Sequence, residues 1–162
     1  MNTIKSETNA TYLVSTAEQD VTIKEALTIL KNRLVTKGAA FTSPDTVKQY
    51  LVLNSGTLEH EIFSCLFLDN QHKLIEYKEL FRGTIDGASV YSREVAKEAL
   101  KLNAAAVIFS HNHPSGIVEP SQADRNITNK LKEALALLDV RVLDHIIVGG
   151  IDTYAFSEHG LI

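Results

Sequence analysis

SHNHPSGIVEPSQAD, from Ser110 to Asp124, is the most informative stretch of this sequence. It follows the apolar run Ala104 to Phe109 and precedes a helical pattern that begins near Gln122. The apolar run predicts a buried strand, and the change of hydrophobic period predicts a helix. We therefore expect a long loop from a strand to a helix, a position in which functional residues are common.

Two histidines and one aspartate in this stretch form a candidate metal site. His111 and His113 are separated by one residue, which at the end of an extended segment directs both imidazoles to the same side. Asp124 follows in the first turn of the predicted helix. Taken singly, each residue has an ordinary structural explanation, such as helix capping for Asp124. Together, two histidine nitrogens and a carboxylate oxygen are a common ligand set for a catalytic zinc ion, with water in the fourth position.

Length and composition limit the function classes. A chain of 162 residues is long enough for one buried core and short for two. The N-terminus lacks a signal-peptide pattern and no apolar run is long enough for a membrane span, so a cytoplasmic protein is expected. The single Cys65 excludes an internal disulfide and a cysteine-cluster metal site, and its apolar neighbours predict burial. The net charge of −4 opposes direct DNA binding, which depends on Lys and Arg.

The remaining sequence predicts helices and strands in alternation. Residues 1 to about 20 are polar and are expected to form a mobile or loosely docked arm. Thr22 to Glu25 is a capping-box pattern that predicts the start of an amphipathic helix, and Ser92 is the predicted N-cap of a later helix. Further helices are expected at residues 44–54 and 122–138, and strands at residues 62–68, 74–81, 104–109, 140–148 and 153–156. This order predicts an α/β sandwich around one mixed sheet, whereas the oligomeric state stays open.

Three enzyme motifs with similar residues do not match. The consecutive His-Asn-His differs from the nuclease motif of that name, whose residues are dispersed through a β-β-α unit. Zinc deaminases need a Pro-Cys-x-x-Cys segment, which a chain with one cysteine cannot supply. The His-Glu-x-x-His helix of many metalloproteases is also missing from the sequence.

A hydrolytic zinc site also needs a general base. Glu119 in the loop is one candidate, and Glu59 and Glu61 at the edge of the strand at residues 62–68 are two others. A carboxylate can take a proton from the water and return it to a leaving amine. Spacing alone does not choose among the three glutamates.

Several motifs carry a resemblance to a known family. His111-x-His113-Pro114 with Ser121-x-x-Asp124 and an upstream glutamate resembles the JAMM (MPN+, JAB) metalloprotease motif. Over about residues 45–162, the chain resembles the C-terminal domain of the RadC family in His111–Gly116, Pro120–Asp124, Asp144–Val148 and the Gly83–Thr84 turn. The resemblance implies a three-layer cytidine-deaminase-like sandwich with a mixed β-sheet flanked by helices. It divides the chain into an N-terminal arm and amphipathic helix at residues 1–42 and a RadC-like JAB/MPN domain at residues 43–162.

The same resemblance implies roles for individual residues. His111, His113 and Asp124 match the zinc ligands, Glu61 matches the general base, and Ser121 matches the serine that stabilises the oxyanion. Helix capping is the alternative for Ser121, and Glu59 is the second choice of base because it shares a strand face with Glu61. His145 is expected to be a satisfied core histidine, with orientation of a metal ligand as the alternative.

The implied activity is hydrolysis of a peptide or isopeptide amide in a peptide or protein substrate. Longer RadC proteins carry a helix-hairpin-helix segment ahead of this domain, and the first 56 residues here are too short and too poor in glycine hairpins to supply it. The alternatives are a DNA-repair-associated accessory protein with a structural metal and a catalytically idle peptide-binding module.

Overall fold

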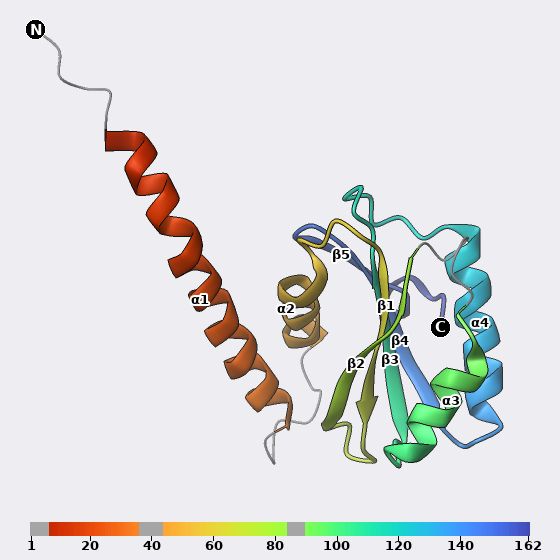
Figure 1. Ribbon diagram of the computed structural model, residues 1–162. Helices are drawn as coiled ribbons and strands as arrows, with labels where there is room; N and C mark the ends of the chain where they lie inside the picture. The colour runs from red at the N-terminus through yellow and green to blue at the C-terminus, as the bar shows by residue number, and fades with distance from the viewer. Residues whose placement is uncertain (1–6, 36–43, 84–89) are drawn as a thin grey trace, which may run out of the picture.

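The protein is a three-layer α/β sandwich in a computed structural model that describes residues 7–35, 44–83 and 90–162 (Figure 1). Its helices are α1 (Glu7–Val35), α2 (Pro44–Ser55), α3 (Ser92–Lys101), α4 (Gln122–Ala136) and the short 3-10 helix η1 (Ser157–His159). Its strands are β1 (Ile62–Leu68), β2 (Leu74–Arg82), β3 (Ala106–Asn112), β4 (Arg141–Gly149) and β5 (Asp152–Ala155). In Figure 1, α2 covers one face of the sheet, and α3 and α4 cover the other. The predicted fold class is confirmed.

The sheet is mixed, with the strand order β2-β1-β3-β4-β5. Of the five described strands, only β3 and β4 pair in parallel, and α4 connects them. The carboxyl ends of parallel strands lie at the same edge of a sheet, and ligands often bind beyond this edge. The chain leaves β3 at this edge and then enters α4. Both ends of the loop between Asn112 and Gln122 therefore lie at this edge of the sheet.

Two apolar cores lie on the two faces of the sheet. Every residue of β1 and of β3 is buried, as expected for central strands covered on both faces. Leu66 and Leu68 of β1 pack toward α2, whereas Phe63 and Phe67 pack toward α3 and α4. A fully buried side chain of this size contributes about 1.5 to 3 kcal/mol to stability. Cys65 is fully buried among these residues, as predicted, and burial raises the pKa of its thiol.

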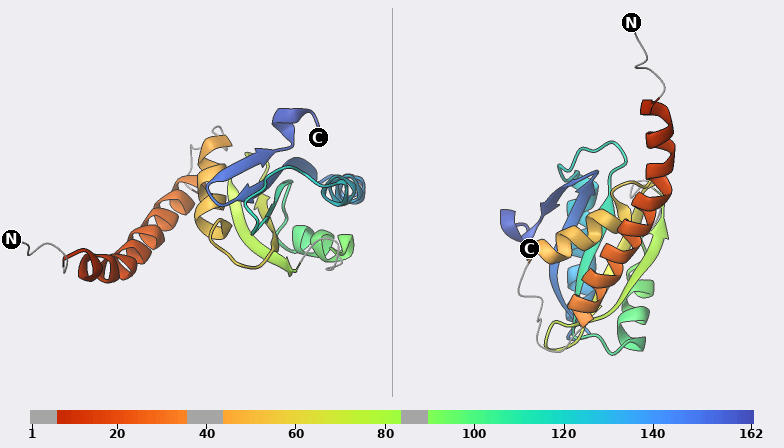
Figure 2. Two further views of the ribbon diagram at one scale, coloured as in Figure 1. Left: turned by 90° about the horizontal axis from the view of Figure 1, so that it is seen from above. Right: turned by 90° about the vertical axis from the view of Figure 1, so that its left-hand side faces the viewer.

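The first helix begins earlier than the sequence patterns predicted. It starts at Glu7, so the predicted helix start at Thr22 is wrong. Residues 7–20, predicted to form a loosely docked arm, are helical. The Thr22 hydroxyl donates a hydrogen bond to the Glu18 carbonyl oxygen at 3.0 Å inside the helix instead of capping it. No glycine or proline interrupts residues 7–35, which allows the helix to continue through polar residues. Figure 2 shows α1 crossing the outside of α2, where Leu30 is buried, and extending beyond the sandwich.

Two other predicted boundaries change. Tyr91 is the N-cap of α3, and the Ser92 hydroxyl, predicted to be that cap, makes no capping bond. Strand β3 ends at Asn112, beyond the predicted end at Phe109, so His111 lies in a strand. Pairing with β1 on one side and β4 on the other continues the strand past its apolar residues. Thr84 of the Gly83–Thr84 turn lies outside the described residues.

The described helices differ from membrane spans, which need about 20 consecutive, predominantly apolar residues. None of them combines the length and the apolar composition that crossing a bilayer requires.

Candidate metal centre

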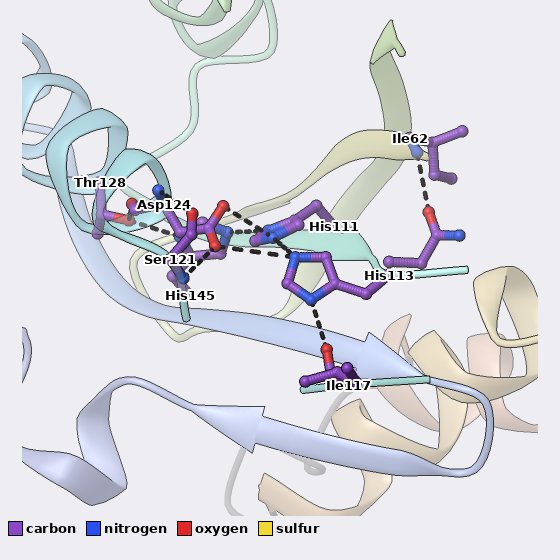
Figure 3. Close-up of polar contacts among 9 residues, drawn as sticks. Ile62, His111, His113, Ile117, Ser121, Asp124, Thr128 and His145 are labelled. Atoms are coloured by element: carbon purple, nitrogen blue, oxygen red, sulfur yellow. Dashed lines mark hydrogen bonds and ion pairs between the residues drawn. The ribbon is translucent and has the colours of Figure 1, made fainter. Parts of the chain in front are cut away.

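Three side chains converge where β3 ends and α4 begins (Figure 3). His111 lies in β3 and is fully buried because β1 and β4 flank this strand. His113 follows the strand, and its side chain is 19% exposed. Asp124 lies in the first turn of α4 and is 2% exposed. Of these three side chains, that of His113 is the most exposed.

The three predicted ligands have their donor atoms close together. The Nε2 atoms of His111 and His113 are 3.0 Å apart. The Asp124 carboxylate lies 3.1 Å from Nε2 of His111 through Oδ1 and 3.7 Å from Nε2 of His113 through Oδ2. A tetrahedral zinc ion with bonds of about 2.0 to 2.1 Å separates its ligand atoms by roughly 3.3 Å. The observed separations fall on both sides of this value, so these residues fit a zinc ion.

The orientation of His113 is set by a backbone carbonyl in the loop. Its Nδ1 lies 2.6 Å from the carbonyl oxygen of Ile117, which can only accept a hydrogen bond. Nδ1 therefore carries the proton, and in the neutral ring Nε2 presents its lone pair to Asp124. The backbone N–H of His113 donates to the Val148 carbonyl at 2.8 Å, which fixes the start of the loop against β4.

Gly149 has no side chain, and the loop segment from Gly116 to Val118 packs against it. A Cβ atom at this position would lie 2.5 Å from the Gly116 carbonyl oxygen and 2.7 Å from Cγ1 of Val118. Both contacts are shorter than van der Waals distances, so a side chain there would displace the segment that carries Ile117. Gly149 thus acts on His113 through the loop.

We expect Gly149→Ala to weaken zinc binding about 10- to 100-fold, the usual effect of disturbing a group that orients a ligand. The measurement is zinc affinity by competition with a chromophoric chelator. Val47→Ala, which shortens a buried side chain of α2, controls for lost stability alone. Equal zinc affinity in Gly149→Ala and wild type would contradict the role of Gly149.

His111 is oriented by a second buried histidine. Its Nδ1 lies 2.8 Å from Nε2 of His145, which is fully buried in β4. Complete burial lowers the pKa of His145 well below its ordinary value, and the His111 ring beside it acts in the same direction, so its ring is neutral. His145 is a satisfied core histidine, as expected, and it also contacts a candidate metal ligand.

Asp124 and Ser121 form a capping box at the start of α4. The Asp124 N–H donates to Oγ of Ser121 at 3.2 Å, and the Ser121 N–H donates to Oδ2 of Asp124 at 2.7 Å. Burial alone would raise the pKa of Asp124, but the His111 ring and the hydrogen bonds of Ser121 hold that pKa well below its ordinary value. Asp124 is therefore an anion. The Ser121 hydroxyl caps the helix, and its role toward an oxyanion stays a prediction.

Glu61 approaches the histidine pair from the other side. One of its carboxylate oxygens lies within 4.8 Å of a ring nitrogen of His111 and of His113, and these three residues could hold a metal ion. Phe63 pairs with His111 across the antiparallel β1 and β3, and period two places Glu61 on the same sheet face as Phe63. Glu59 and Glu119, the other candidate bases, are exposed. Among the described residues, neither belongs to a group that could hold a metal.

Asn112 fixes the backbone on both sides of Glu61, which the sequence analysis did not anticipate. The Ile62 N–H donates to Oδ1 of Asn112 at 2.8 Å, and Nδ2 of Asn112 donates to the His60 carbonyl at 3.0 Å. Asn112 lies between the two histidines in sequence, so its side chain points to the opposite face of β3. This alternation was visible in the sequence, but the partner segment 50 residues away was not.

Residues 41–161 match a protein family described as RadC-like JAB domain. One similar protein, the UPF0758 protein of Vibrio cholerae, is 57% identical over 150 residues, which cover 92% of this chain and 94% of that protein. A second UPF0758 protein of the same organism is 56% identical and is covered over 90% of its length. A UPF0758 protein of Nitrosococcus oceani is 60% identical over 126 residues, which span only 56% of its length.

Proposed function

Because this chain belongs to the RadC-like JAB domain family, we propose that it is a zinc-dependent hydrolase that cleaves a peptide or isopeptide amide. The observation that carries the proposal is the convergence of three side chains, whose donor atoms lie 3.0, 3.1 and 3.7 Å from one another. Two imidazole nitrogens and a carboxylate oxygen are a ligand set that a catalytic zinc ion commonly uses. A second carboxylate, that of Glu61, lies farther from the two histidines than that of Asp124, and we assign it the role of a base.

Asp124 is the better third ligand for two reasons. Its carboxylate lies within 3.1 and 3.7 Å of the two Nε2 atoms, whereas that of Glu61 is placed only within 4.8 Å of the histidine nitrogens. It is also buried and held by the capping box, so little side-chain entropy is lost when it binds an ion. We therefore assign the fixed carboxylate of Asp124 to the metal and the less buried carboxylate of Glu61 to proton transfer.

A zinc ion held by His111, His113 and Asp124 would supply an acidified water and would polarise the scissile carbonyl. Glu61 accepts the proton of the attacking water and returns it to the leaving amine. The Ser121 hydroxyl accepts the Asp124 N–H, and its own proton would donate to the developing oxyanion. His113 is the more exposed of the two histidines, and substrate enters from its side.

Removal of the metal tests the proposal. We expect zinc-loaded protein to cleave members of a mixed peptide and isopeptide library, and chelated protein to lose this activity and regain it with added zinc. The measurement is mass spectrometry of the products. If the protein binds one equivalent of zinc but cleaves no library member, the metal site stands and the proposed hydrolysis is rejected. Absence of zinc binding would reject the whole proposal.

The partners follow from the same proposal. The substrate is a peptide or protein, and the net charge of −4 disfavours direct contact with DNA phosphates. The chain spans about half the length of the longer UPF0758 relatives, so their additional segments would have to supply any nucleic-acid contact. The cytoplasmic location stays a prediction.

A further inference from the structure

A chain of buried hydrogen bonds runs from His111 back to the backbone of Asp124. Beyond the contact between His111 and His145, Nδ1 of His145 lies 2.6 Å from Oγ1 of Thr128. The Thr128 hydroxyl donates to the backbone carbonyl of Asp124 at 2.6 Å. His111, His145, Asp124 and Thr128 are all at most 2% exposed, so water does not replace these partners.

The acceptor at the end of this chain determines every proton position in it. A carbonyl oxygen can only accept, so the single hydroxyl proton of Thr128 points to Asp124. Oγ1 of Thr128 must then accept from Nδ1–H of His145. The neutral ring of His145 consequently has a lone pair on Nε2, which accepts from Nδ1–H of His111. Nε2 of His111 is left without a proton.

We propose that Thr128 and His145 are positioning residues that hold His111 in the tautomer whose Nε2 lone pair faces the metal. The inference rests on the proposed zinc site. Asp124 acts in it twice, because its carboxylate faces the metal while its backbone carbonyl fixes the tautomer of a second ligand. Sequence separates Thr128 from Asp124 by one helical turn, so α4 presents both groups together.

Loss of the Thr128 hydroxyl would reverse the direction of the hydrogen bond between His145 and His111. Without an acceptor for Nδ1–H, the His145 proton is free to move to Nε2, where it donates to Nδ1 of His111. His111 must then carry its own proton on Nε2, and that proton competes with the metal. We expect Thr128→Val to weaken zinc binding about 10- to 100-fold, as for other groups that orient a metal-binding histidine.

Zinc affinities of four proteins test the inference. Thr128→Ser retains the hydroxyl and should bind zinc like wild type, whereas Thr128→Val should not. Ser64→Ala removes another buried hydroxyl, which donates to the Ser110 carbonyl on the opposite sheet face, and should also bind like wild type. Equal affinity in Thr128→Val and wild type overturns the inference while leaving the zinc site intact. A wild type without zinc overturns the proposed function instead.

Nitrogen-15 NMR of the imidazole rings provides an independent readout on wild type. We expect zinc-loaded protein to show His145 as the Nδ1–H tautomer and His111 protonated at Nδ1. Assignment of the His145 proton to Nε2 would overturn the inference even if Thr128→Val failed to fold.

Discussion

Replacing Asp124 with asparagine is expected to lower zinc affinity by at least about 100-fold, more than the loss of an orienting group causes. Asparagine preserves the size of the side chain and an oxygen that can accept the Ser121 N–H, but it removes the negative charge that faces the two imidazole rings. The measurement is competition with a chromophoric chelator, together with metal analysis of the purified protein. Far-ultraviolet circular dichroism should remain unchanged.

The matched control is Asp139→Asn at the opposite end of α4. Asp139 is exposed and has a φ of 57°, a backbone conformation that asparagine also adopts readily. The control therefore removes the same charge without strain and should leave zinc affinity unchanged. Retained zinc in Asp124→Asn, combined with lost zinc in Glu61→Gln, would assign the third ligand to Glu61 and reject the proposed roles.

Replacing Glu61 with glutamine is expected to reduce hydrolysis about 10²- to 10⁴-fold while zinc binding is retained, because glutamine cannot accept the proton of the attacking water. The rate is measured on a peptide identified with the wild-type protein, and zinc content is measured on the same sample. The fall should appear in kcat rather than in KM, since the side chain acts on the reacting water.

Glu59→Gln is the corresponding control for Glu61. Glu59 precedes Glu61 by two residues and is exposed, and it lies outside the group that could hold a metal. Its replacement should change neither the rate nor the zinc content. A wild-type rate in Glu61→Gln would show that another group transfers the proton, and an equal loss in both variants would indicate a general charge effect.

Local patterns in the sequence predicted the elements of the sandwich because hydrophobic period reports which residues face a core. They predicted β1 and β2 closely, since apolar runs and the turn at residues 69–71 are local features. They failed at Thr22 because a capping residue type also occurs inside a helix when its hydroxyl finds another partner. They missed the start of α3 by one residue, because Tyr91 takes the N-cap position without a side-chain capping bond. The far end of β3 was missed because pairing with two neighbouring strands, rather than apolar character, extends it.

The candidate site divides in the same way. The proximity of His111, His113 and Asp124 was predicted from spacing, whereas Glu61 was selected by the resemblance to JAMM proteins. The contacts of Asn112 and Thr128 were not predicted, because each connects segments that are adjacent only in the folded chain. The sequence alone therefore does not identify polar residues that orient the groups of a site from a distant segment; the tertiary structure does.

The crossover from β3 through α4 has a thermodynamic consequence for motif searches. A free peptide with the sequence of residues 110–124 contains the same three donor groups, but their order would have to be created when the ion binds, at roughly 1 to 2 kcal/mol for each backbone residue fixed. In the folded protein, sheet pairing and the helix have already removed that entropy. Metal affinity is therefore a property of the folded crossover, and a match to the short motif alone does not measure it.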